Sequence, residues 1–209
     1  MPDLKNRRPL ASRQTRLAQA AARWLTVRGA SPDAISAAGI LAALLAGAAL
    51  AFAPAHPALW LAGAVCVQLR LLANLLDGMV AVEGGRGGPL GPLWNEAPDR
   101  IEDVAILYGF GLAAGAPLLG LWTCIAALLT AYVRVLGGSL GLPQSFMGPM
   151  AKQHRMAAVT AGCALGFIEA VAGGGWGLPR LVLAAILAGA ILTAARRTLG
   201  VAAGLRERG

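Results

Sequence analysis

Two groups of polar residues near the middle of the chain have the types and spacing of a metal-binding site. The first group is Asn74 and Asp77, three residues apart, and the second is Asn95, Asp99 and Asp103, each four residues from the next. On a helix, such spacings place the members of each group on one face. Two facing helices would bring their carboxylate and amide oxygens together, and oxygen ligands of this kind suit Mg²⁺ or Mn²⁺.

The acidic residues of the chain are concentrated in the same region. Six of the ten acids lie between Asp77 and Asp103, and the segments around them are strongly apolar. Carboxylates at the margin of a membrane helix are costly unless they are paired, hydrated or bound to a metal, so they indicate a functional site. Neither a Walker lysine pattern nor a Rossmann fingerprint accompanies them. A diphosphate ligand would therefore be held through the metal and not by a glycine-rich loop.

The composition places these residues in a membrane protein. Of the 209 residues, 57% are hydrophobic and 13% are charged, whereas about a quarter of a soluble domain is charged. Six apolar segments, several near the roughly 20 residues that cross a bilayer, lie at 35–53, 58–81, 97–116, 118–136, 155–172 and 179–195. Residues 10–28 have an apolar side and a basic side, as helices in the membrane interface do. We therefore predict an all-α integral membrane protein with six transmembrane helices, preceded by an N-terminal interfacial amphipathic helix.

The basic residues predict the orientation of the chain in the membrane. The turns near 54–57 and 115–120 carry no Lys or Arg, whereas the N-terminal arm, the 70–100 region, the end of the fourth segment, the 148–155 loop and the C-terminal tail do. Cytoplasmic loops carry that bias, so both termini and the acidic stretch are expected on the cytosolic face of a bacterial-type plasma (inner) membrane. The net charge of +8 fits attraction to anionic headgroups, and no nucleic-acid partner is expected. The expected domains are a cytosolic arm with the interfacial helix (1–30), the six-helix membrane domain (31–200) and a cytosolic tail (201–209).

The polar groups resemble the motif of a known family. The CDP-alcohol phosphatidyltransferases carry the pattern Asp-x2-Asp-Gly-x2-Ala-Arg-x8-Gly-x3-Asp-x3-Asp. The corresponding positions in this chain, with the same spacing throughout, are Asn74, Asp77, Gly78, Ala81, Val82, Gly91, Asn95 and Asp99. The interfacial helix, the six spans and a motif that bridges the second and third spans are also similar to that family.

Three positions depart from the family pattern. Asn74 and Asn95 replace the first and third Asp, and Val82 replaces the Arg. The family's four carboxylates commonly hold two metal ions, so two negative charges are missing from the expected ligand set. An amide oxygen can still bind a metal, and Mg²⁺ often has only one or two protein carboxylates together with phosphate oxygens. One metal ion is expected on this basis, and a second would need Glu96 or Asp103, of which Asp103 lies on the same helix face as Asn95.

The resemblance implies a reaction and a role for each of these residues. A phosphatidyl group would pass from a CDP-activated lipid (CDP-diacylglycerol) to an alcohol, with release of CMP, in phospholipid biosynthesis. Asp99 occupies the position of the general base, which takes the proton of the attacking hydroxyl. The implied metal ligands are Asp77, Asp99, Asn74, Asn95 and Asp103, and the implied CDP-binding residues are Gly78, Ala81 and Gly91.

Two basic residues are candidates for binding the acceptor alcohol. In several members of the family, basic residues at these places bind the phosphate of a phosphorylated acceptor, which implies this role for Arg134 at the end of the fourth segment and Lys152 before the fifth. The alternative is that they are positive-inside anchors whose side chains reach the lipid headgroups. This alternative applies above all to Lys152 and its neighbours His154 and Arg155.

The sequence leaves three functions open. The first is a membrane transferase that uses Mg²⁺ or Mn²⁺, takes a small alcohol or phosphorylated alcohol as acceptor, and forms a homodimer as the resemblance implies. The second is a catalytically weakened relative that acts as a lipid- or nucleotide-binding membrane scaffold. The third is a small transporter, which would place its acids near the middle of the membrane in broken helices. The expected cytosolic position of the acids argues against the transporter.

Overall fold

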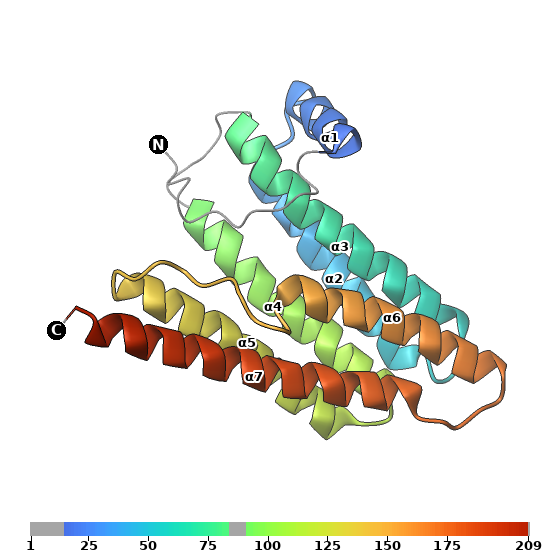
Figure 1. The fold of residues 1–209 in the computed structure, drawn as a ribbon. Helices are drawn as coiled ribbons and strands as arrows, with labels where there is room; N and C mark the ends of the chain where they lie inside the picture. Colours follow the sequence, from blue (N-terminus) through green and yellow to red (C-terminus); the bar gives the residue numbers. More distant parts are fainter. Residues whose placement is uncertain (1–14, 84–90, 209) are drawn as a thin grey trace.

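The computed structural model describes residues 15–83 and 91–208. Over these two ranges the chain forms seven α-helices and no strand. The helices are α1 (Arg16–Val27), α2 (Pro32–Phe52), α3 (Ala58–Glu83), α4 (Gly91–Ala113), α5 (Pro117–Ser139), α6 (Lys152–Val171) and α7 (Leu178–Arg206). Figure 1 shows α2 to α7 as a bundle, with α1 set apart at one end beside the last turns of α3.

Four of these helices are long and apolar enough to span a membrane. They are Pro32–Phe52, Ala58–Val82, Pro117–Ser139 and Leu178–Arg206. The all-helical prediction is confirmed for the described residues. The helices α4 and α6 each carry charged residues in their first half and are not among the four. That α4 and α6 also span the membrane therefore stays a prediction, and so does the total of six transmembrane helices.

Helix starts and turns follow from local chemistry. The α2 helix begins at Pro32, because Ser31 Oγ accepts a hydrogen bond from the backbone N–H of Ala34 at 3.1 Å and Pro32 occupies the first turn. The tight turns before α5 and α7 contain Gly115 (φ +61°) and Gly177 (φ +71°). Only glycine adopts this left-handed conformation without a steric cost.

The N-terminal helix α1 accounts for most of the part of the predicted 10–28 helix that the structure describes. Its small residues Ala18 and Ala22 pack on a patch of α3 that includes Met79 and Val80. The side chains of Leu17 and Trp24 on its other faces are 84% and 54% exposed. Residues 10–14 of the predicted helix lie outside the described residues. The interfacial location of α1 stays a prediction, and its exposed apolar side chains are what an interfacial helix requires.

Glycines let the central helix α4 approach its neighbours closely. A Cβ added to Gly47 of α2 would lie 2.5 Å from the carbonyl oxygen of Ala105, and one added to Gly109 would lie 2.5 Å from that of Gly47. On the other side, a Cβ added to Gly111 would lie 2.6 Å from the Cα of Gly120 in α5. Small residues at helix contacts are typical of membrane bundles. As a result α4 packs on α2 and α5, and it also contacts α6 and α7.

Candidate functional site

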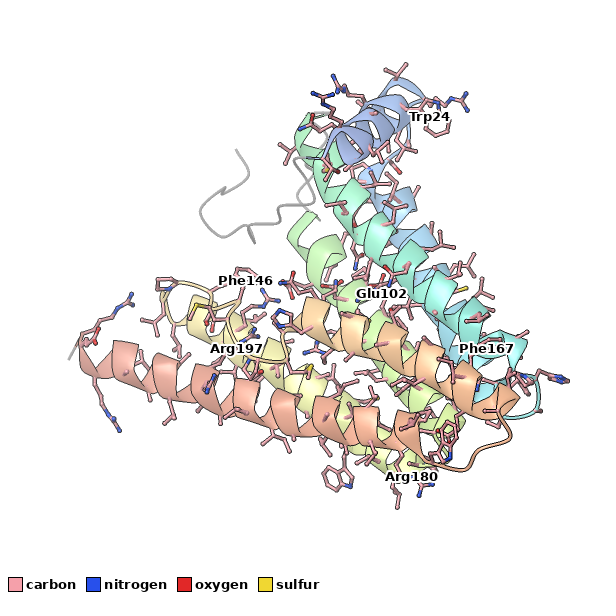
Figure 2. All side chains as sticks on the ribbon, turned by 45° about the vertical axis from the view of Figure 1, so that its right-hand side comes forward. Trp24, Glu102, Phe146, Phe167, Arg180 and Arg197 are labelled. Carbon is pink, nitrogen blue, oxygen red and sulfur yellow. The ribbon has the colours of Figure 1, made fainter. Side chains whose placement is uncertain are left out.

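Polar residues from α3 and α4 meet inside the bundle. Arg70, Asn74 and Asp77 follow one another at helical spacing on α3, and Asp99, Glu102 and Asp103 do so on α4. Glu102, labelled in Figure 2, lies in the interior of the molecule and is 0% exposed. The fold thus brings polar side chains of α3 and α4 together, although some of the residues in contact differ from those expected.

The side-chain amide of Asn74 links two carboxylates of α4. Its Nδ2 donates to Asp99 Oδ1 at 3.0 Å and to Glu102 Oε2 at 3.1 Å. Asn74 was expected as a metal ligand, and that role remains untested. The contacts that the structure gives it are those of a hydrogen-bond donor between two acids.

Two buried arginines neutralise the acids deeper in the bundle. Arg70 donates from Nε to Glu102 Oε2 at 2.5 Å and from one Nη to Asp103 Oδ1 at 3.1 Å. Arg155 of α6 donates to the other Asp103 oxygen at 2.6 Å. Buried charges are tolerated when they are paired in this way. Both oxygens of Asp103, the expected compensating metal ligand, thus accept hydrogen bonds from arginine.

Asp77 is held by groups of its own neighbourhood. Ser36 Oγ on α2 donates to Asp77 Oδ2 at 2.7 Å, and the backbone N–H of Gly78 donates to Oδ1. The carboxylate also interacts electrostatically with Asp99 and Lys152. Asp77 therefore belongs to the same charged cluster as Asp99, at the end of it that α2 and α3 form.

Lys152 joins the cluster from the first turn of α6. Its Nζ donates to Asp99 Oδ1, and Arg70 also lies 3.5 Å from that oxygen. Burial lowers the pKa of the Lys152 ammonium, while the nearby Asp99 carboxylate opposes that shift. If Lys152 were only an anchor whose side chain reaches the lipid headgroups, its contact with Asp99, the candidate general base, would have no explanation.

Arg134 lies near the end of α5 and is 8% exposed. It donates to both carboxylate oxygens of Glu96, at 2.8 and 2.6 Å, and to Gln144 Oε1 at 2.5 Å. Its guanidinium also lies 5.1 Å from the centre of the Phe146 ring, a cation–π distance. Figure 2 labels Phe146 on the segment between α5 and α6. Arg134 thus ties this segment and α5 to the first turns of α4.

The donor chemistry of the cluster fits a hard divalent cation. Among the described residues, no group of three or more His, Cys, Asp or Glu side chains has metal-binding geometry. The oxygens available are those of Asp77, Asp99 and the Asn74 amide, and the side chain of Asn95 lies outside the described residues. Mg²⁺ is commonly held by one or two carboxylates, with phosphate oxygens and water completing the shell. The Asp77 and Asp99 carboxylates meet that requirement, whereas the pairing of Asp103 with two arginines makes it a poor additional ligand.

Of the three small residues expected at the CDP site, Gly78 lies beside this cluster. Gly78 directly follows Asp77 and donates to it, and Ala81 is half-buried one turn further along α3. A Cβ added to Gly91 at the start of α4 would meet no atom within 4 Å. Their role in nucleotide binding stays a prediction.

Known proteins that resemble this chain were found by sequence, although no family model matches it. The phosphatidylinositol phosphate synthase of Streptomyces avermitilis is 30% identical over 149 residues, which cover 68% of this chain and 59% of that protein. The archaetidylinositol phosphate synthase of Aeropyrum pernix is 34% identical over 117 residues, 54% of this chain and 60% of that protein. The inner membrane protein YnbA of Escherichia coli is 30% identical over 133 residues, 63% of this chain and 66% of that protein. The matched regions thus span about three fifths to two thirds of these relatives.

Solved structures of similar shape are those of the phosphatidylinositol phosphate synthase of Mycobacterium tuberculosis. The structure with CDP-DAG bound has a TM-score of 0.72 at 23% identity, and the match covers 90% of this chain and 94% of that one. The complex with manganese and citrate has a TM-score of 0.71, with 88% of both chains covered. This chain therefore has the same fold.

The relatives support the CDP-alcohol phosphatidyltransferase family. Within that family's pattern, sequence reasoning missed the buried partners of the acids: Arg70, Glu102, Arg155 and Ser36. Arg70 was counted among the basic residues that orient the chain, but it is 0% exposed. A signal was present, because Arg70 precedes Asn74 by four residues within a long apolar segment, and a lone intramembrane charge needs a partner.

Proposed function

We propose that this chain is a CDP-alcohol phosphatidyltransferase, which transfers a phosphatidyl group from CDP-diacylglycerol or a similar CDP-activated lipid to an alcohol and releases CMP. The observation that carries this proposal is the polar cluster between α3 and α4, in which Asn74 of α3, one turn before Asp77, and Lys152 of α6 both donate to Asp99 of α4. Relatives named as phosphatidylinositol phosphate and archaetidylinositol phosphate synthases support the same reaction class.

In this proposal Asp99 is the general base. Its Oδ1 accepts hydrogen bonds from Asn74 and Lys152. The other oxygen, Oδ2, has the weaker Arg100 contact at 3.8 Å. Oδ2 is thus the oxygen that can take the proton of the acceptor hydroxyl as that hydroxyl attacks phosphorus.

Asp77 and the backbone around it would hold the nucleotide end of the donor. Ser36 and the Gly78 N–H fix the Asp77 carboxylate from two sides, so it is oriented before any ligand binds. Bound Mg²⁺ or Mn²⁺ supplies charge neutralisation of the diphosphate and of the departing CMP. Gly78 and Ala81 leave space against the α3 backbone for the cytidine diphosphate.

Lys152 and Arg134 are the proposed contacts for the acceptor. Lys152 already touches Asp99, so an acceptor phosphate bound by Lys152 would bring its hydroxyl close to the base. Arg134 is paired with Glu96. It would bind the acceptor by exchanging part of this pairing for a contact with the acceptor phosphate. The proposal includes a cytosolic site in an inner-type membrane and a homodimer, as in the sequence-based expectation.

The direct test is CMP release by the purified protein with CDP-diacylglycerol, Mg²⁺ or Mn²⁺ and a panel of alcohols and phosphorylated alcohols. We expect Asp99→Asn to lower the rate by at least about a hundredfold, since a general base contributes roughly that much. We expect Asp77→Asn to abolish release. The matched control is Asp33→Asn, the same change at an exposed aspartate on α2, which should keep wild-type activity. Equal activity of Asp99→Asn and Asp33→Asn would rule out the assigned base.

The second candidate is a catalytically weakened relative that binds lipid or nucleotide as a membrane scaffold. The observation in its favour is that Asp99 and Asp103 already have cationic partners in Lys152, Arg70 and Arg155. The acceptor panel separates the two functions. Tight binding of a CDP-lipid without CMP release from any acceptor would support the scaffold.

A further inference from the structure

Asn74 stands where the family pattern has an Asp, and its contacts suggest a purpose for the substitution. The two hydrogens on Nδ2 are directed at Asp99 Oδ1 (3.0 Å) and Glu102 Oε2 (3.1 Å). An ionised carboxylate only accepts hydrogen bonds, so the amide must present its nitrogen to this pair. The opposite amide orientation would place Oδ1 against two carboxylate oxygens and is excluded by charge.

Glu102 makes an amide at position 74 necessary. Its side chain is 0% exposed, and Oε2 accepts from both Arg70 and Asn74. The second oxygen, Oε1, has no hydrogen-bond partner among the described residues. Glu102 Oε1 and Asn74 Oδ1 both border Gly39, lying 3.0 and 3.7 Å from the position of a Cβ there. An aspartate at 74 would add a third carboxylate between Asp99 and Glu102 and remove the amide donor that joins them.

Like charges at this distance in a low-dielectric interior cannot all stay ionised. Most of the nearby cationic groups are already bonded, Arg70 to Glu102 and Asp103 and Lys152 to Asp99. Within the described part of the chain, the Arg70 Nη1 group is without a hydrogen-bond partner. An added charge at 74 would therefore push Asp99 toward Lys152 and Arg100 and away from Asp77.

We propose that Asn74 is a positioning residue, which holds Asp99 in place for metal and acceptor by donating to Asp99 and Glu102 together, and that Asn74 and Glu102 form an interdependent pair. This inference deepens the proposed function and rests on it. In this pair the amide is a donor, not a weakened substitute for a metal-binding carboxylate. Restoring the family's Asp at position 74 alone should then harm the site.

The test compares four proteins in lipid nanodiscs: wild type, Asn74→Asp, Glu102→Gln and the double variant Asn74→Asp/Glu102→Gln. The double variant keeps the number of carboxylates and reverses donor and acceptor between positions 74 and 102, but it leaves no donor between position 74 and Asp99. The matched control is Gln19→Glu on α1, an amide-to-acid change outside the cluster. Mn²⁺ affinity is measured by electron paramagnetic resonance without substrate, and the kcat and KM of CMP release are measured separately.

We expect Asn74→Asp to weaken Mn²⁺ binding about tenfold and to lower kcat more than it raises the KM for the lipid, because Asp99 is displaced. The double variant should recover only part of the Mn²⁺ affinity, because the new amide at position 102 can donate to the new carboxylate at position 74 but no group donates between position 74 and Asp99. Gln19→Glu should match wild type. If Asn74→Asp binds Mn²⁺ as tightly as wild type or more tightly, or if the double variant binds no better than Asn74→Asp, the proposal is overturned. If Asn74→Asp does not fold, a folded double variant that binds Mn²⁺ supports the pair, and one that does not bind it refutes the pair.

Failure of the inference and failure of the proposed function give different results. Mn²⁺ binding by the substrate-free protein reports on the Asn74–Glu102 pair whether or not any acceptor is turned over. A wild type that binds Mn²⁺ but releases no CMP would contradict the transferase, while the four Mn²⁺ affinities would still decide the role of Asn74.

Discussion

The two halves of α4 are stabilised in opposite ways. From Glu96 to Asp103 the helix is rich in charge, and its buried acids are paired with Arg70, Arg155 or Lys152 of other helices. From Ala105 onward it is apolar and meets its neighbours through glycines in backbone contact. The first half depends on which chemical group faces which, whereas the second depends on the size of each residue. A substitution that removes a charge but keeps the length of the side chain should therefore damage the first half. A substitution that changes the size of a side chain but keeps its polarity should damage the second half.

The largest effect is expected from Arg70→Met, which keeps the length of the side chain and removes its charge. Glu102 would lose its cation, and Asp103 would keep only Arg155. Breaking a buried pair on one side costs about 3–5 kcal/mol of the free energy of unfolding. The midpoint of thermal unfolding in detergent measures the loss, and CMP release should fall with it.

Arg180→Met is the control for this change. Arg180, labelled near the lower edge of Figure 2, makes an exposed hydrogen bond to the carbonyl of Gly115. We expect its unfolding midpoint to match wild type. Equal midpoints for the two variants would contradict the importance of charge in the first half of α4.

A smaller effect, which arises from side-chain size and not from charge, is expected from Gly47→Ala. The added methyl group would lie 2.5 Å from the Ala105 carbonyl oxygen, so α2 and α4 must move apart, at about 1–3 kcal/mol. Gly200→Ala on α7 is the matched change, with nothing within 4 Å of the new Cβ. That variant should gain up to about 1 kcal/mol from helix propensity. Unfolding midpoints that shift in the same direction would show that the glycine contact is not tight.

The smallest effect is expected from Phe110→Leu in the apolar half. Phe110 is 0% exposed and meets Trp60 edge to face, with ring centres 6.0 Å apart. Loss of such an aromatic contact costs roughly 0.5–1.5 kcal/mol beyond the change in buried area. Phe52→Leu, at a 65% exposed phenylalanine, should unfold at the wild-type temperature. CMP release by Phe110→Leu should stay near wild type, since no charged group is altered.

Much of the architecture could be predicted from the sequence because its signals are local. Apolar length located the helices. In the structure their starts lie at Ser31-Pro32 and after glycine turns such as Gly115. The α4 helix begins at Gly91, six residues before the predicted apolar segment 97–116, and the spacing of Asn95 and Asp99 had already placed Asn95 on this helix.

The candidate site could be predicted only in part. Residue spacing brought Asn74, Asp77 and Asp99 to facing helices, and the structure joins them in one cluster. The expectation that Asp103 would be available to a metal did not anticipate Arg70 and Arg155, since one lies on α3 and the other on α6.

The sequence by itself determined which residues carry charge, how they are spaced along each helix, and that most of the chain is too apolar for water. Only the tertiary structure decided which acid meets which cation, and that the Asn74 amide donates to Asp99 and Glu102. The physical reason is that charge pairing in a dry interior depends on contacts a few ångströms long between segments distant in sequence. Those contacts are set by how closely the glycines of α2, α4 and α5 allow the helices to approach.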